Sequence, residues 1–416
     1  LHGSFPIFFH DEKDMRLEVA IMRSWIGIRQ KVRWGFLSGL YMMQTSFADT
    51  SDELRKAETA RLDVDPFVSA RASGMGGALS TIADGIDAPY YNPALIGGFK
   101  EHAWSKESIR GVHFPYLGAA VNENSASLYQ QHQDRGAVSP RLVGESLLEV
   151  NQGKRQFFRN SGAFSWHWYR IVLLPFYDRQ LAAFRVPGMV QGEPNIRVDH
   201  LETTGFGYGF SAAARDDSFA IGVFGTTENK ARVQGDFTVD ELVDTEARSA
   251  KFAENTQTYS GNTLHLGALW HLGKKMRPRI AIVNRHVGES QYESSDPSAT
   301  SLNIPNDLSV GFSFGPKLGK KGRLTWIIEA QKLTQPQVAL SKKLKTALEM
   351  TLWGPGRDGI VGLRAGYGIA GGSGGLNFNF GVLEFEAAIE SRDVGLDYHV
   401  VADRRAVASF AIHLLP

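Results

Sequence analysis

The residues best placed to do chemistry are four charged side chains within otherwise apolar, alternating stretches: Glu329, Lys345, Glu349 and Arg364. In strands, alternate residues face opposite sides, and all four would fall on the polar side. Acids and bases gathered on one buried side form ion pairs, because an unpaired buried charge is costly. We expect them either to pair with one another and hold a neighbouring segment in place, or to form a polar wall along a path for a solute.

Signals for covalent or metal chemistry are weak. The chain has no cysteine, which excludes a disulfide scaffold, a thiolate metal site and a cysteine nucleophile. The glycine- and serine-containing stretch 371–374 is interpreted as a turn between strands rather than a hydrolase nucleophile turn. His265 and His271 would lie too far apart on one strand to share a metal ion. We therefore expect no catalytic residue, no metal, no cofactor and no enzyme activity.

Two groups of acids leave alternatives open. Asp84 and Asp87 either bind a cation or form capping and turn hydrogen bonds. The acidic stretch from Asp236 to Glu246 is either a solvated loop or a place for divalent ions near lipid headgroups.

The charge balance is nearly neutral, with 45 Lys and Arg against 44 Asp and Glu. It provides no field for gathering nucleic acid, so we expect no nucleic-acid partner. Beyond the N-terminal region the chain has no apolar run long enough for a membrane-spanning helix. Spanning strands remain possible, because their alternating apolar and polar residues average to a low hydropathy.

Residues 1–48 are interpreted as a targeting region. A prefix precedes a start at Met15 or Met22, followed by basic residues, an apolar run from Trp34 to Met43 and small residues up to Ala48. A membrane anchor is the weaker interpretation, because the apolar run is short. We expect cleavage after Ala48 and export from the cytoplasm.

After residue 109 the dominant period is two. The clearest alternating stretches are 206–214, 264–272, 308–314, 324–330, 344–352, 361–367, 376–380 and 408–414. This period is typical of strands that separate two environments. Residues 124–160 interrupt it with an amphipathic helical pattern, and residues 234–258 interrupt it with an acidic stretch that we expect to be a loop.

The alternating strands fit either a soluble sandwich or a transmembrane barrel. The export signal, the strand length and the small polar residues on the non-apolar face favour the barrel. We expect an all-β fold, a transmembrane antiparallel β-barrel of about fourteen strands over residues 101–416. Aromatic residues suited to its membrane interfaces are Trp166, Trp168, Tyr169, Trp270, Trp326 and Trp353.

Residues 67–99 are rich in glycine and other small residues, so they can pack closely but cannot form a long free helix. We expect two short helices, Gly77–Ala83 and Pro93–Ile96, the second with Asn92 as its N-cap.

The stretches Ala72–Ala78, Ala83-Asp84 and Ala88–Ala94 resemble the N-terminal signature of the FadL-type outer-membrane barrel superfamily, which includes fatty-acid and hydrocarbon transporters and TraF-like and PorV-like relatives. The stretch Gly362–Tyr367 and the glycine turn after it are similar to the closing strands of that group. The resemblance implies that residues 49–100 form a small helical plug inside the barrel. Its plug residues here are Gly74, Met75, Gly76, Gly77, Asp84, Asn92, Pro93 and Ala94.

The sequence departs from the transporters after Ala94, where Leu95-Ile96-Gly97 is closer to the TraF-like branch. Two functions follow as expectations. One is passive transport of a hydrophobic small molecule across a bacterial outer membrane. The other is a non-transporting barrel that serves as a scaffold or assembly partner in conjugation or secretion machinery. The expected partners are membrane lipid, a hydrophobic small-molecule ligand and the outer-membrane assembly machinery.

Overall fold

The computed structural model describes residues 62–63, 68–97, 110–125, 155–190, 193–216, 218–273, 276–297, 299–318, 322–353, 360–395 and 400–414. The expected prefix and signal peptide at 1–48 lie outside these residues, and so does 126–154 of the expected helical insertion. Across the described ranges, no helix is both long enough and apolar enough to cross a membrane.

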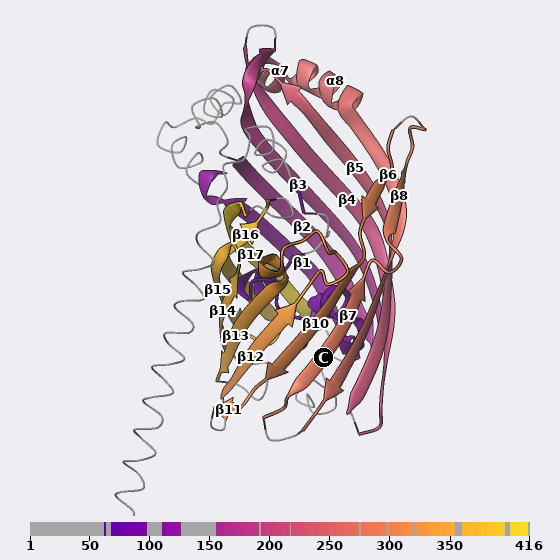
Figure 1. The fold of residues 1–416 in the computed structure, drawn as a ribbon, viewed down its shortest axis with the longest axis vertical. Helices are drawn as coiled ribbons and strands as arrows, with labels where there is room; N and C mark the ends of the chain where they lie inside the picture. Colours follow the sequence, from indigo (N-terminus) through magenta and orange to yellow (C-terminus); the bar gives the residue numbers. More distant parts are fainter. Residues whose placement is uncertain are drawn as a thin grey trace, which may run out of the picture. The chain divides into compact units, whose positions relative to one another are not determined.

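The alternating stretches form strands of one antiparallel sheet (Figure 1). The first strands are β1 Arg110–Asn122, β2 Arg155–Trp168, β3 Ile171–Val190, β4 Glu193–Ala213, β5 Phe219–Phe237 and β6 Thr256–His271. The next are β7 Arg279–Arg285, β8 Ser290–Ser294, β9 Leu302–Ile304, β10 Asp307–Phe314, β11 Lys317–Leu318 and β12 Gly322–Ala330. The last are β13 Leu344–Leu352, β14 Val361–Gly368, β15 Gly371–Asn379, β16 Leu383–Asp393 and β17 Ala402–Leu414.

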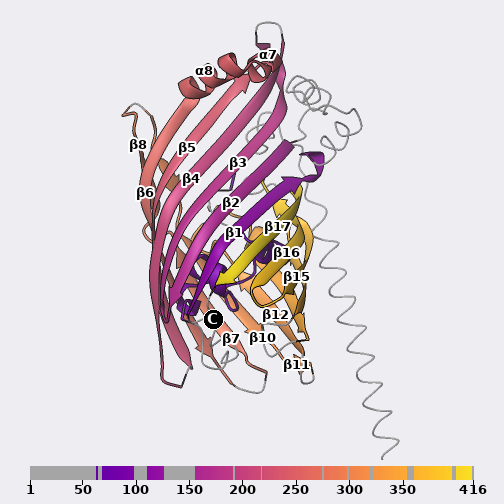
Figure 2. The ribbon, with the colours of Figure 1, turned by 180° about the vertical axis from the view of Figure 1, so that it is seen from behind.

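The sheet closes on itself, because β1 pairs with β2 on one side and with β17 on the other (Figure 2). Three short strands continue longer ones: β8 extends β7 along β6, β9 extends β10 along β8, and β11 extends β10 along β12. The described strands therefore trace a closed barrel of fourteen antiparallel strands. This confirms the predicted fold class and strand number.

The two faces of the wall differ as the alternation predicts. Large apolar side chains such as Phe206, Leu266 and Phe312 are exposed on the outer face. Their neighbours on the inner face, such as Ser309, are buried and mostly small or polar. Trp166, Trp168, Trp326 and Trp353 are also exposed. A closed ring with an apolar outer belt leaves no unpaired strand edge where such a belt would meet lipid.

The strands are unequal in length. β3, β4 and β5 have 20, 21 and 19 residues, whereas β14 and β15 have 8 and 9. A tilted spanning strand needs about 9–11 residues. One side of the barrel therefore stands taller than a membrane requires, as Figure 1 shows.

Two helices, α7 (Val239–Val243) and α8 (Thr245–Asn255), occupy most of the region 234–258 that the sequence predicted as a loop. The loop prediction is wrong because the acids in this region cap helices. Thr238 and Glu241 form a capping box, and Asp244 caps α8. The helices cover an apolar cluster on the tall strands that includes Ile196, Val198, Val233 and Phe237, and Val239 of α7 belongs to the same cluster. Similarly, residues 155–160 of the expected insertion belong to β2.

The described residues 68–97, here called the N-terminal segment, contain α3 (Ala70–Gly74), η1 (Gly85–Asp87), α4 (Ala88–Tyr91) and η2 (Pro93–Leu95). Asn92 caps η2 by accepting a hydrogen bond from the Ala94 amide, as predicted. The predicted helix Gly77–Ala83 is wrong. Gly76 and Gly77 adopt φ of 59° and 79°, which ends the helix before it, and the Ser80 amide donates to a barrel carboxylate instead of a helical carbonyl.

The outer belt leads to a matched test on one face of β5. Ile221→Arg places a charge inside the exposed apolar belt, and Asn229→Arg places the same charge on the same face farther along the strand. We expect Ile221→Arg to reduce the free energy of unfolding in lipid vesicles by about 2–4 kcal/mol and Asn229→Arg to change it little. Heat-modifiable gel migration across a urea series measures both. Equal losses would contradict the assignment of this face to lipid.

Candidate functional site: the N-terminal segment and the inner face of the barrel

The N-terminal segment lies against the inner face of the wall, and glycines make the close approach possible. A Cβ on Gly222 of β5 would collide with the backbone of Pro93, and one on Gly366 of β14 would collide with the backbone at Met75. Gly74 also lies close to Gly375 of β15, where a Cβ on Gly74 would be 3.1 Å from the Gly375 Cα. Main chain thus packs directly on main chain at widely separated points of the ring.

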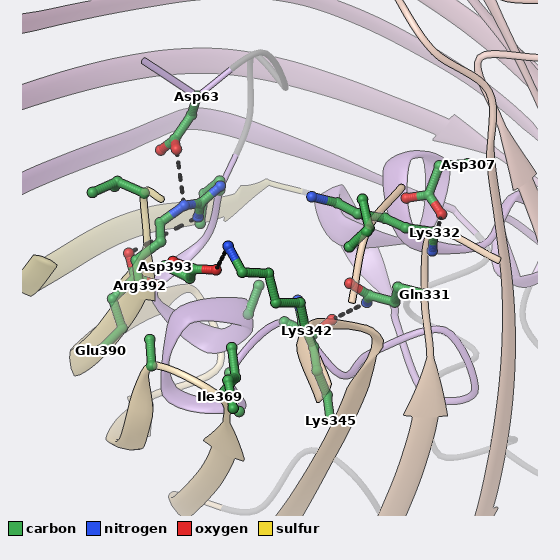
Figure 3. Close-up of a pocket in the computed structure, with 18 of the residues that line it drawn as sticks. Asp63, Asp307, Gln331, Lys332, Lys342, Lys345, Ile369, Glu390, Arg392 and Asp393 are labelled. Atoms are coloured by element: carbon green, nitrogen blue, oxygen red, sulfur yellow. Dashed lines mark hydrogen bonds and ion pairs between the residues drawn. The ribbon is translucent and has the colours of Figure 1, made fainter. Parts of the chain in front are cut away.

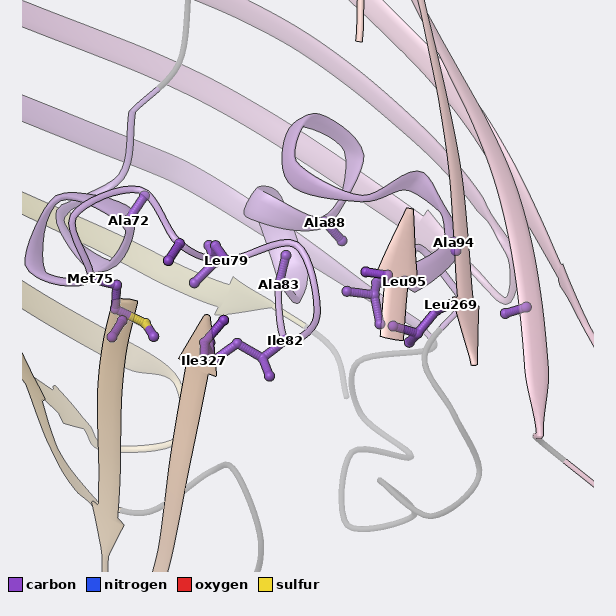
Figure 4. Close-up of a cluster of buried hydrophobic side chains, with 14 residues drawn as sticks. Ala72, Met75, Leu79, Ile82, Ala83, Ala88, Ala94, Leu95, Leu269 and Ile327 are labelled. Atoms are coloured by element: carbon purple, nitrogen blue, oxygen red, sulfur yellow. The ribbon is translucent and has the colours of Figure 1, made fainter. Parts of the chain in front are cut away.

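An apolar cluster fills the space between the segment and the wall (Figure 4). Met75, Leu79 and Ala83 of the segment are fully buried, and Leu269 and Ile327 reach them from β6 and β12. Burying such side chains stabilises packing by about 1.5–3 kcal/mol each for the larger ones. The segment is therefore an integral part of the barrel interior.

A chain of buried ion pairs joins the segment to β13, β14 and β16. Arg71 of α3 donates from Nε and Nη2 to Glu349 at 2.9 and 3.0 Å, and it also pairs with Asp84. Glu349 pairs with Arg364 at 3.1 Å, and Arg364 pairs with Glu386 at 2.8 Å. Two of the four charged residues singled out in the sequence therefore lie in one network with the segment.

The other two lie side by side on neighbouring strands. Glu329 and Lys345 are direct partners in the β12–β13 ladder. Glu329 accepts hydrogen bonds from the Ser80 amide at 3.0 Å and the Ser80 hydroxyl at 2.8 Å. The Lys345 ammonium lies over Gly77, where a side chain would collide with it. All four residues thus lie next to the segment.

A second anchor, which sequence reasoning missed, is Asp63, just ahead of the segment. Its carboxylate pairs with arginines from three strands: Arg392 of β16 at 2.8 Å, Arg405 of β17 at 2.8 Å and Arg159 of β2 at 3.1 Å. The side chain of Gln180 on β3 bonds both the amide and the carbonyl of Asp63 at 2.9 Å.

Burial alone would raise the pKa of Asp63, but the three guanidiniums outweigh it and hold the pKa well below its ordinary value. The carboxylate is therefore ionised and fully engaged at neutral pH. Its partners lie on strands that are far apart in the sequence, so no local motif marks them.

The remaining predicted plug residues lie within this packing. Gly76 and Gly77 form the turn after α3. Asn92 is buried and its amide donates to the Ser80 carbonyl at 2.8 Å, which ties η2 to the preceding turn. Pro93 and Ala94 are buried in η2 against β5 and β6.

A cavity of about 270 Å3 lies beside the segment (Figure 3). Its lining includes Asp63, Lys342, Lys345, Arg392 and Asp393. Lys342 pairs with Asp393 at 2.9 Å, so much of this lining is internally neutralised. Aliphatic residues such as Leu62 and Ile369 also line the cavity, so its surface is mixed.

A larger and more apolar groove of about 680 Å3 lies where the wall is interrupted. β6 pairs with β7 over Leu266–His271 and with β8 over Tyr259–Gly261, which leaves a gap between them. The connection 286–289 fills that gap, with His286, Gly288 and Glu289 at positive φ. The groove is lined by Ile171, Tyr208, Phe210, Val223 and Leu264, with Asn262, Thr263, Glu289 and Ser290 among its polar residues.

Other candidates for chemistry do not converge. His265 is buried, bonded to Thr263 at 3.1 Å and packed on His286, whereas His271 lies near Arg279. Residues 371–374 belong to β15, so their interpretation as a turn is wrong; the turn is at 369–370. Within the described ranges, no three His, Cys, Asp or Glu side chains are grouped to hold a metal ion.

Comparisons with known proteins give structural matches alone. No family model matches the chain, and no curated protein does. A mutant of the monoaromatic hydrocarbon channel TodX matches with a TM-score of 0.49 at 12% identity, covering 85% of this chain and 100% of that one. The toluene transporter TbuX of Ralstonia pickettii matches with a TM-score of 0.47 at 13% identity, over 84% of this chain and 99% of that one. A FadL homologue of Pseudomonas aeruginosa matches with a TM-score of 0.28 at 8% identity, over 84% and 98%.

The Asp63 anchor predicts a large difference between two isosteric substitutions. Asp63→Asn removes the carboxylate that three arginines share and leaves Arg159 to pair with Asp178 and Arg405 with Asp403. We expect a loss of about 3–5 kcal/mol in the free energy of unfolding. Asp236→Asn breaks the half-exposed pair with Arg197, and we expect a loss of at most about 1 kcal/mol. Urea unfolding in lipid vesicles measures both. A loss for Asp63→Asn no larger than for Asp236→Asn would contradict the anchor.

Proposed function

We propose that the protein is an outer-membrane barrel that lets a small hydrophobic molecule pass passively across the membrane. The observation that carries this proposal is the apolar groove of about 680 Å3 at the interrupted part of the wall. A concave apolar surface of this size with a few polar groups suits a small organic molecule. The aromatic and aliphatic residues of the groove lie on the outer face of the barrel, as the apolar belt does. A molecule dissolved in lipid would therefore reach the groove without crossing water.

The outer-membrane location is supported by the exposed apolar belt around a closed ring of strands. Membrane lipid is then the partner of the outer face. Insertion would depend on the outer-membrane assembly machinery, after export with a cleaved signal peptide.

In this proposal the N-terminal segment is the plug. It occupies the barrel interior through the apolar cluster, the Arg71 network and the Asp63 anchor. Passage along the barrel axis requires the segment to shift, and the cavity beside it provides space into which side chains can move. The route uses no cofactor and no catalysis.

A second candidate function is a scaffold in conjugation or secretion machinery. The paired charges that hold the segment against the wall favour this function, because a scaffold protein can keep its interior permanently filled whereas a channel cannot. The two functions differ in whether any molecule crosses.

Toluene is a suitable probe, because two of the structural matches are described as toluene transporters. We expect cells that export this protein to take up radiolabelled toluene several-fold faster than cells with an empty vector. Leu264→Trp fills the groove and should return uptake most of the way to the vector rate. Leu348→Trp, an equally exposed outer position on β13, should leave uptake unchanged.

Uptake at the vector rate by correctly inserted protein would contradict transport of this class of molecule and favour the scaffold. Equal loss in both tryptophan variants would contradict the groove as the entry point.

A further inference from the structure

The ion-pair network around Arg71 holds more acids than bases. Among the described residues, Asp84, Glu349 and Glu386 form ion pairs with Arg71 and Arg364. Asp87 lies close enough to Arg71, Asp84 and Glu386 for their charges to act on it. Four carboxyl groups therefore share two guanidiniums inside the barrel.

Asp87 is the member with the poorest partners. It lies at the end of η1 with 4% of its surface exposed, and its Oδ1 has no hydrogen-bond partner within the described part of the chain. Ser69 and Arg71 favour its charged form, whereas Glu386 and Asp84 oppose it. An ionised carboxylate in this position is costly, because it is neither hydrated nor fully bonded.

The other groups near this site do not remove the conflict. Glu386 of β16 is shared with Arg364 and with the Ser409 hydroxyl of β17 at 3.1 Å. Glu384 of β16 is engaged by His413 at 3.0 Å. Tyr116 of β1 adds a buried phenol and no positive charge. A bound proton is the simplest way to neutralise Asp87.

We propose that Asp87 is a proton-dependent latch, which keeps the N-terminal segment seated in the barrel when protonated and loosens it when ionised. Burial raises the pKa of Asp87 to about 7, with Glu386 adding to the effect. In a released segment the carboxyl returns toward its ordinary value of 3.8. The seated state therefore binds the proton more tightly. It is favoured at acid pH, and this stabilisation falls progressively as the pH rises from about 4 to about 7, the range between the two pKa values.

Only the effect of this latch on transport rests on the proposed function, because a loosened segment would open the path through the barrel. The motion itself is measurable without transport. Since the chain has no cysteine, a single cysteine at the buried Ala83 reports release of the segment through its reaction with a maleimide. A cysteine at the exposed Ala250 of α8 gives the reference rate at each pH and corrects for thiol ionisation.

We expect the ratio of the two rates, in full-length protein in lipid vesicles, to rise by up to about tenfold per pH unit from about pH 5 to about 7 and to level off above 7. Asp87→Asn mimics the protonated form and should hold the ratio flat and low over the same range and above it. Asp240→Asn, the same change on exposed α7, should keep the rise of the unsubstituted protein. Glu386→Gln removes a neighbouring negative charge that raises the pKa of Asp87, so the ratio should level off at a lower pH.

A flat ratio in protein with Asp87 intact, or a rise that persists in Asp87→Asn, would overturn the latch. If Asp87→Asn does not insert, the Glu386→Gln variant decides, and a levelling-off pH that does not move overturns the latch. A pH-dependent ratio without toluene uptake would leave the latch standing and refute the transport function.

Discussion

Reciprocal charge pairing between the wall and the N-terminal segment is the interaction on which the interior depends. The wall presents arginines on β2, β16 and β17 to Asp63, and it presents carboxylates on β12 and β13 to Arg71 and the Ser80 amide. Within the wall, Arg159 pairs with Asp178, Arg405 with Asp403 and Glu349 with Arg364. The added pairs with Asp63 and Arg71 join these buried charges to the N-terminal chain, and losing one partner of such a pair is costly. At the contacts, Gly222 and Gly366 leave room for the main chain of the segment, where a Cβ would collide with it.

The sequence was sufficient for the parts of the fold that follow from local periodicity. Alternation at positions such as 264–272 and 308–314 placed Leu266 and Phe312 on the outer face and Ser309 on the inner one. The pair Asn92-Pro93 predicted the start of η2, because Asn is a common N-cap and Pro is common at the first helical position. The helical prediction at Gly77–Ala83 failed because tertiary bonds, above all Ser80 to Glu329, replaced helical ones.

The rest depended on contacts between residues far apart in the chain. The partners of Asp63 come from Arg159, Arg392 and Arg405, which no spacing connects. Likewise, helices α7 and α8 form where acids first suggested a loop, because the tall strands leave an apolar cluster to be covered. The connection between β7 and β8 contains three residues at positive φ, His286, Gly288 and Glu289. Of these, only the glycine is a residue type that predicts such a conformation from sequence. The more apolar space thus lies in the wall, while the space beside the segment has a mixed lining.

The central claim is that the N-terminal segment is seated inside the barrel against specific strands. Disulfide trapping tests it most directly, because the chain has no cysteine of its own. A side chain at Gly311 of β10 would touch the Ser80 side chain, whereas Phe312 next to it points outward. The account predicts that Ser80→Cys with Gly311→Cys forms an oxidised, faster-migrating species in membranes, and that Ser80→Cys with Phe312→Cys does not. Equal cross-linking of both pairs, or none in the first pair of correctly inserted protein, would contradict it.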